Sequence, residues 1–161
     1  MKYIYIGKIV NTHALKGEVR LISNFEFKER IFKKDFKFYI GQNKNEEKIE
    51  TYRTHKQYDM VKFINIDNIN DVLKYKGSNV YINEEDLLLN NEELLESDYP
   101  NMQLYNNDKH IGQIEHYRND NGNEMIRVNN KYIPYNKNFI TKIDKENKKI
   151  IMHDIEVFLW K

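Results

Sequence analysis

The chain has 161 residues and contains no cysteine. Disulfide bonds, thiolate metal sites and cysteine nucleophiles are therefore excluded. No apolar run reaches the roughly 18 residues that a membrane-spanning helix needs, and the run at the N-terminus, MKYIYIGKIV, is too short for a signal peptide. We therefore expect a soluble, cytoplasmic protein with no membrane contact.

The sequence also has few of the patterns that accompany catalysis. Its six glycines form neither a dinucleotide-binding GxGxxG pattern nor a phosphate-binding P-loop. None of its serines, Ser23, Ser78 and Ser97, lies in a nucleophile-elbow context. Its five histidines show neither the helical i, i+4 pairing nor the neighbouring carboxylate clusters of a metal site. We therefore expect a protein that is not an enzyme and that uses no metal or cofactor.

The chain does have enough apolar and aromatic residues to fold. Hydrophobic residues make up 40% of the sequence, with twelve tyrosines and eight phenylalanines among them. Such a composition can build a packed core, and the length suits one ordinary domain or two small ones.

Charge is distributed unevenly along the chain. The net charge is +1, but residues 1–83 hold 16 basic and 10 acidic residues (+6), whereas residues 84–161 hold 10 and 15 (−5). The stretch 84–98, EEDLLLNNEELLESD, contains acids and no base. A basic half suits phosphate and a more acidic half suits protein, although scattered surface charge can also divide unevenly by chance.

The first half reads mainly as short strands. Segments rich in Ile, Val, Tyr and Phe alternate with Asn, Gly and charged clusters, near 3–10, 18–22, 36–40, 48–53, 60–66 and 79–82. One short helix is expected in IDNINDVLKYKG, with Asn68 or Asn70 as its cap and Gly77 after its end. Six strands with one small helix predict a closed antiparallel β-barrel.

A second strand-rich unit is expected after the acidic stretch. Its strands lie near 102–105, 111–117, 124–128, 131–135 and 149–153, and Asn121-Gly122 marks a hairpin turn. The fold class is therefore mainly β, with two small β-barrels. The predicted organisation is a first domain over 1–83, an acidic linker over 84–93 and a second domain over 94–161.

The stretch GKIVNTHALKGEVRL, residues 7–21, is the strongest candidate for a binding site. It reads as two strands joined by a tight exposed connection, so that Lys8, His13, Lys16 and Arg20 can gather at one end of a barrel. Clustered cations beside backbone N–H groups suit a phosphate backbone. A hairpin whose charges only keep it soluble is the alternative.

The same residues carry a family resemblance. Gly7-Lys8-Ile9-Val10, His13 and Leu15-Lys16-Gly17-Glu18-Val19-Arg20 resemble the N-terminal signature of the RimM family of bacterial ribosome maturation factors. Three later segments are similar to family elements in the right order: VKFINIDNINDVLKYKGSNVYI, then HIGQI, and YIPYNKNFITKIDKENKKIIM. The last two resemble the PRC-type barrel that forms the second domain of the family.

The resemblance implies a two-barrel, non-catalytic and monomeric assembly factor. Family members bind the free small (30S) ribosomal subunit, help its head to mature and support efficient 16S rRNA processing. The implied partners are small-subunit ribosomal protein nineteen and the 16S rRNA of the head.

Two positions depart from the family pattern. Ala14 stands where the family usually has glycine, and a left-handed backbone there would cost alanine about 1 kcal/mol, so a different turn is possible. Leu94 and Leu95 stand where the family carries paired tyrosines that bind the ribosomal protein. The resemblance makes this pair a candidate protein-binding site, and the alternative is that both leucines belong to a core.

Two rival functions remain open. One is a general ribosome-associated or single-strand RNA-binding barrel protein without an assembly role. The other is an enzyme, because barrels of this kind also occur in flavin-binding reductases; a yellow colour after purification would reveal it. No constellation of acid, base or nucleophile supports the enzyme.

Overall fold

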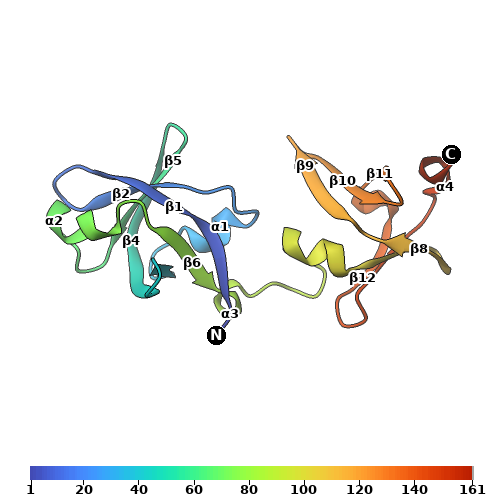
Figure 1. The fold of residues 1–161 in the computed structure, drawn as a ribbon, viewed down its shortest axis with the longest axis horizontal. Helices are drawn as coiled ribbons and strands as arrows, with labels where there is room; N and C mark the ends of the chain where they lie inside the picture. The colour runs from blue at the N-terminus through green and yellow to red at the C-terminus, as the bar shows by residue number, and fades with distance from the viewer. Residues whose placement is uncertain (161) are drawn as a thin grey trace. The chain divides into compact units, whose positions relative to one another are not determined.

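The computed structural model describes residues 1–160 and divides into two compact units, Met1–Leu88 and the chain from Leu89 onward (Figure 1). Both units are built mainly from β-strands. Within residues 1–160, no helix has the length and apolar character needed to cross a membrane.

The first unit is a closed barrel of six strands with the order β1-β2-β5-β4-β3-β6, and every neighbouring pair is antiparallel. The strands are β1 (Tyr3–His13), β2 (Glu18–Ile22), β3 (Lys37–Ile40), β4 (Asn45–His55), β5 (Tyr58–Phe63) and β6 (Asn79–Asn83). Side chains alternate as the sequence predicts: Val19 and Leu21 are fully buried, whereas Arg20 between them lies on the outer face.

Strand β1 bends so that it can pair with β6 along its first half and with β2 along its second half. Its register shifts between Tyr5 and Gly7, and again between Ile9 and Asn11. A Cβ added at Gly7 would lie 2.4 Å from the carbonyl oxygen of Ile22. The strands therefore cross so closely at this bend that only glycine fits.

The short helices of the first unit are α1 (Lys28–Ile31), α2 (Ile69–Val72), the 3₁₀ helix η1 (Leu73–Tyr75) and α3 (Glu84–Leu87). The predicted helix is confirmed as α2 with η1: the Asn68 side chain accepts a hydrogen bond from the Asn70 N–H over 2.8 Å. Gly77 follows with a φ of +82°. Helix α1 was not foreseen.

Part of the stretch expected to be a linker belongs to the first unit. The Asn83 side chain caps α3, Leu87 is buried, and the Glu84 N–H donates to the Lys2 carbonyl over 2.9 Å. A run of acids looks like solvent-exposed chain in sequence, but here it occupies the favourable first turn of a capped helix. The domain limits at 83 and 94 stay a prediction.

The second unit contains two sheets, one with the order β11-β10-β9 and one with the order β12-β13-β7-β8. The strands are β7 (Gln103–Asn106), β8 (Lys109–Gln113), β9 (His116–Asp120), β10 (Asn123–Val128), β11 (Lys131–Pro134), β12 (Ile140–Asp144) and β13 (Lys149–Met152). The helices are η2 (Glu96–Asn101), η3 (Lys137–Phe139) and α4 (Glu156–Leu159). One core that includes Leu104, Ile126 and Ile150 draws on both sheets.

The second unit differs in three details from the sequence prediction. The segment 111–117 is two strands, because the chain passes from one sheet to the other at Ile114-Glu115, where the N–H groups donate to Met102 and Arg127 respectively. Strand β12 was missed, and β13 pairs with β7 in parallel. The turn at Asn121-Gly122 is confirmed, with positive φ at both residues.

Candidate nucleic-acid interface

The β1–β2 connection keeps a left-handed backbone at the position where the family usually has glycine. Ala14 has a φ of 65°, so alanine accepts the strained conformation instead of changing the turn. Gly17 has a φ of +88°, and a Cβ there would lie 3.0 Å from the Ile66 carbonyl oxygen. The Ile69 N–H donates to the Leu15 carbonyl over 3.0 Å. The loop is thus fixed against the segment that leads into α2.

Two of the four predicted binding residues meet beside this loop. The Arg20 guanidinium lies 2.8 Å from Nδ1 of His13, and its carbon lies 5.5 Å from the centre of the Tyr58 ring. The rings of His13 and His55 lie 6.1 Å apart. The ends of two hairpins, β1–β2 and β4–β5, therefore bring together an arginine, two histidines and a tyrosine. These four side chains are called the hairpin cluster below.

An ion pair links strands β2 and β4 near the hairpin cluster. Arg53 donates two hydrogen bonds to the Glu18 carboxylate, over 2.7 and 3.0 Å. This two-fold contact raises the pKa of Arg53 and joins β4 to the start of β2. Arg53 thereby compensates the negative charge of Glu18. This carboxylate is therefore not the ion-pair partner of Arg20, which lies two residues further along β2.

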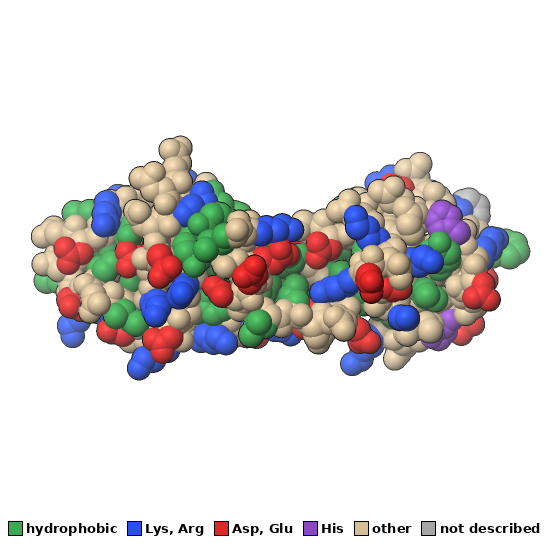
Figure 2. Space-filling model, turned by 90° about the horizontal axis from the view of Figure 1, so that it is seen from below, with side chains coloured by type: hydrophobic (Ala, Val, Ile, Leu, Met, Phe, Trp, Pro, Cys, Tyr) green, Lys and Arg blue, Asp and Glu red, His purple; other side chains and the backbone are tan. Residues whose placement is uncertain are grey.

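Charge elsewhere on the surface is mixed. Figure 2 shows Lys and Arg side chains interspersed with Asp and Glu on each of the two units. The excess of positive charge in the first half therefore forms no single uniform patch on this face. Local clusters of side chains, more than net charge, identify the candidate binding surface.

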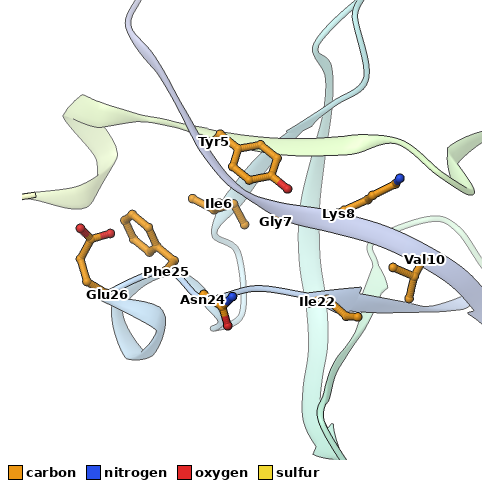
Figure 3. A pocket seen from close by; sticks show the side chains of 9 residues that line it. All are labelled: Tyr5, Ile6, Gly7, Lys8, Val10, Ile22, Asn24, Phe25 and Glu26. Carbon is orange, nitrogen blue, oxygen red and sulfur yellow. The ribbon is translucent and has the colours of Figure 1, made fainter. Parts of the chain in front are cut away.

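The other two predicted cations lie apart from each other. Lys16 is exposed in the β1–β2 loop next to the hairpin cluster. Lys8 is exposed on β1, where it lines a hollow of about 430 Å³ together with Tyr5, Ile22 and Asn24 (Figure 3). The structure thus joins His13 and Arg20 directly, places Lys16 next to them and places Lys8 on a different part of β1.

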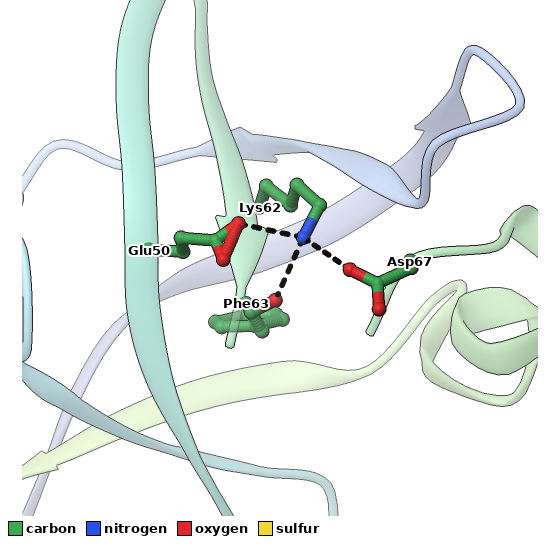
Figure 4. A network of polar contacts seen from close by, with 4 residues as sticks. All are labelled: Glu50, Lys62, Phe63 and Asp67. Carbon is green, nitrogen blue, oxygen red and sulfur yellow. Dashed lines mark hydrogen bonds and ion pairs between the residues drawn. The ribbon is translucent and has the colours of Figure 1, made fainter. Parts of the chain in front are cut away.

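One lysine near the loop has a structural task. Lys62 donates to Glu50 over 2.7 Å, to Asp67 over 2.9 Å and to the Phe63 carbonyl over 3.5 Å (Figure 4). Hydrogen bonds to Glu50, above all, raise its pKa. Lys62 therefore ties down the segment after β5, on which Gly17 packs, and its charge is already satisfied.

The structure places Leu94 in a core, which supports the alternative that the leucine pair is structural; its role in protein binding stays a prediction. Leu94 is 7% exposed and belongs to the core of the second unit, and Leu95 is 3% exposed. Asp98 accepts a hydrogen bond from the Leu95 N–H over 3.0 Å and so caps η2. Burial, which the sequence does not show, leaves little of either side chain at the surface of the second unit.

Sequence reasoning missed the contribution of the β4–β5 hairpin. His55 and Tyr58 pair directly across a two-residue turn in which Lys56 has a φ of 57°. A Lys-Gln turn lacks the Asn-Gly or Asp-Gly signature that marks such hairpins. The alternation on either side of Lys56-Gln57 was the available signal.

Comparison with known proteins supports the sequence resemblance. The family model described as the RimM N-terminal domain matches residues 4–87. The chain belongs to the RimM family.

Relatives extend the similarity to the whole chain. A ribosome maturation factor RimM from Ligilactobacillus salivarius is 36% identical, over 94% of this chain and 96% of that protein. The ribosome maturation factor RimM of Staphylococcus haemolyticus is 34% identical, over 97% of this chain and 98% of that protein. The crystal structure of the RimM protein of Pseudomonas aeruginosa covers 98% of this chain at a TM-score of 0.50 and 15% identity, which supports the fold.

Proposed function

We propose that this chain is a ribosome assembly factor that binds the free small ribosomal subunit, assists maturation of its head and supports efficient 16S rRNA processing. The observation that carries the proposal is the near full-length similarity to proteins named ribosome maturation factors. The factor would act by binding alone, as a cytoplasmic monomer, and without a cofactor.

In this proposal the first unit contacts rRNA. The hairpin cluster offers a guanidinium, Arg20, held in place by His13 and Tyr58, and Lys16 adds an exposed ammonium beside it. Guanidinium and ammonium groups bind phosphate oxygens, and aromatic rings at the same place suit unpaired bases. The 16S rRNA of the head is the proposed target.

The second unit is proposed to be a PRC-type barrel that binds small-subunit ribosomal protein nineteen. Its two sheets share one core, as the sheets of a small barrel do. Because Leu94 is buried, the contact would use surface residues instead of the leucine pair. The acidic residues Glu92, Glu93, Glu96 and Asp98 of this unit can attract a basic ribosomal protein.

The alternative function is general single-strand or ribosome-associated RNA binding without an assembly role, which the same cationic and aromatic cluster would serve. Co-sedimentation of the purified protein with free small subunits, free large subunits and intact ribosomes separates the two. Binding to free small subunits alone is expected. Equal binding to all three particles would favour the alternative, and binding to none of them would contradict the proposal.

A further inference from the structure

Four tyrosines lie together on the outer surface of the barrel. Tyr5, Tyr81 and Tyr39 occupy one cross-strand row on β1, β6 and β3, and Tyr3 lies two residues before Tyr5 on the same face. The ring centres of Tyr5 and Tyr81 are 6.0 Å apart, and those of Tyr3 and Tyr39 are 5.3 Å apart. These four residues are called the tyrosine row below.

The four tyrosines differ in the fraction of each residue that is exposed to solvent. Tyr39 is 5% exposed and forms the base of the row, whereas Tyr3 is 38% and Tyr5 is 54% exposed. Tyr5 meets Tyr81 edge to face, at an interplanar angle of 73°. An edge contact leaves much of a ring face uncovered, so Tyr5 presents aromatic surface to solvent while it packs against the Tyr81 ring.

Two lysines lie near this surface. The Lys44 ammonium lies 4.3 Å from the centre of the Tyr81 ring and 5.5 Å from that of Tyr3. Lys8 lines the hollow of about 430 Å³ that adjoins Tyr5 (Figure 3). Glu26 also lines that hollow, and burial, with Glu46 and Asp86 nearby, raises the pKa of Tyr39, so acids are present in the hollow and near the buried end of the row.

We propose that Tyr5 is a stacking surface for an unpaired nucleobase, with Lys8 and Lys44 contacting the phosphates on either side. Every base has a flat face that stacks on an exposed ring, and a polyanion needs flanking cations of this kind. This inference rests on the proposed RNA-binding function and names its ligand more closely: single-stranded RNA segments, in contrast to duplex.

A tyrosine of the second unit provides a matched control. Tyr132 is 39% exposed, compared with 54% for Tyr5. However, the guanidinium carbons of Arg118 and Arg127 lie 5.7 and 5.5 Å from the centre of its ring, and its hydroxyl contacts Nε2 of His116 over 3.3 Å. Its ring is therefore already covered by cations, and a base would have to displace them.

The test measures the dissociation constants of labelled single-stranded RNA oligonucleotides by fluorescence anisotropy. The proteins compared are the unaltered chain, Tyr5→Ala, Tyr5→Phe, Tyr5→Leu and Tyr132→Ala. Loss of one stacked base is expected to weaken binding roughly 5- to 150-fold in Tyr5→Ala, with a loss in Tyr5→Leu as well. Tyr5→Phe and Tyr132→Ala should bind like the unaltered chain, and a duplex should not respond to Tyr5→Ala.

Tyr5→Leu keeps an apolar side chain, so it guards against a folding defect in Tyr5→Ala; melting temperatures of all variants verify this. Unchanged single-strand affinity in both variants, or an equal loss in Tyr132→Ala, would overturn the stacking surface. Loss of small-subunit binding with unchanged oligonucleotide binding would also overturn it and would indicate a protein contact instead.

Co-sedimentation of the unaltered chain tests the proposed function separately. If the chain binds oligonucleotides through Tyr5 but binds no subunits, the stacking surface is retained and the assembly role is lost.

Discussion

The guanidinium of Arg20 and the imidazole of His13 are joined by a hydrogen bond of 2.8 Å across the β1–β2 hairpin. Arginine has only donors, so Nδ1 of His13 must be the acceptor and the ring carries its proton on Nε2. The bond holds the guanidinium over Tyr58 and beside the loop that carries Lys16. It thus orients a charge that would otherwise be free to move.

Reversing charge at the loop should weaken RNA binding and its dependence on salt. The variant Lys16→Glu with Arg20→Gln removes one cation from the hairpin cluster and one from the loop beside it. Each lost phosphate contact should reduce the slope of log affinity against log salt by about one, because fewer counterions are released. Co-sedimentation with small subunits across a salt series measures this. Lys34→Glu, at another exposed lysine of the first unit, is the control; an identical slope in the loop variant would contradict the phosphate role.

Ala14→Gly should stabilise the first unit by about 1 kcal/mol or less, because alanine at a φ of 65° carries left-handed strain that glycine lacks, partly offset by the greater freedom of glycine in the unfolded chain. Thermal or urea unfolding measures the change. Ala14→Val should act in the opposite direction, and a glycine variant less stable than the unaltered chain would show that the turn is not strained.

Gly17→Ala should destabilise more than Gly122→Ala, although both glycines have positive φ. A Cβ at Gly122 meets nothing within 4 Å, so that change costs only backbone strain of about 1–2 kcal/mol. At Gly17 the Cβ would also crowd the backbone of Ile66 and Asn68, which adds roughly 1–3 kcal/mol. Equal losses of stability for the two variants in urea unfolding would mean that the backbone near Gly17 shifts to accommodate the added Cβ at little cost.

Leu94→Ala should cost about 2–5 kcal/mol of stability, as expected for a truncated core leucine. The folded fraction should bind subunits normally. Melting and affinity are measured on the same preparation, with exposed Leu88→Ala as the control. Reduced affinity at unchanged melting temperature would restore Leu94 as an interface residue.

Stability of the second unit should fall in alkali. Burial raises the pKa of Tyr135 to about 12 and also raises that of Tyr99. An unfolded tyrosine titrates near 10, so between about pH 10 and 12 the unfolded state binds fewer protons than the folded state. The contribution of these tyrosines to the free energy of unfolding is complete below pH 10 and is lost as the pH rises toward 12. Urea midpoints over this range should fall less in Tyr135→Phe than in the unaltered chain.

Much of the barrel follows from local sequence. Alternation in EVRLI predicts the buried pair Val19 and Leu21, and the Asn68 cap predicts the start of α2; both depend on neighbouring residues alone. Leu94 and Leu95 show the limit. An apolar pair among acids looks the same whether it is packed or exposed, since burial depends on partners as distant as Ile150.

The hairpin cluster was half predictable for the same reason. His13, Lys16 and Arg20 are close in sequence, so one hairpin places them together. His55 and Tyr58 join them only because β2 pairs with β5, which brings together residues almost forty positions apart. Lys8 and His13 lie on the same strand, but five residues of extended chain, about 16 Å, separate them along β1.

The parallel pairing of β7 with β13 has a consequence for synthesis of the chain. The barrel of the first unit needs nothing beyond Asn83, so it can close on the translating ribosome while later residues are still being added. The second unit folds later, because β7 (Gln103–Asn106) gains its parallel neighbour β13 only after Lys149–Met152 has emerged from the ribosome. The nascent protein should therefore carry a finished first unit attached to an unfinished second one, and arrest of translation between these points should yield a protease-resistant fragment ending near Leu88.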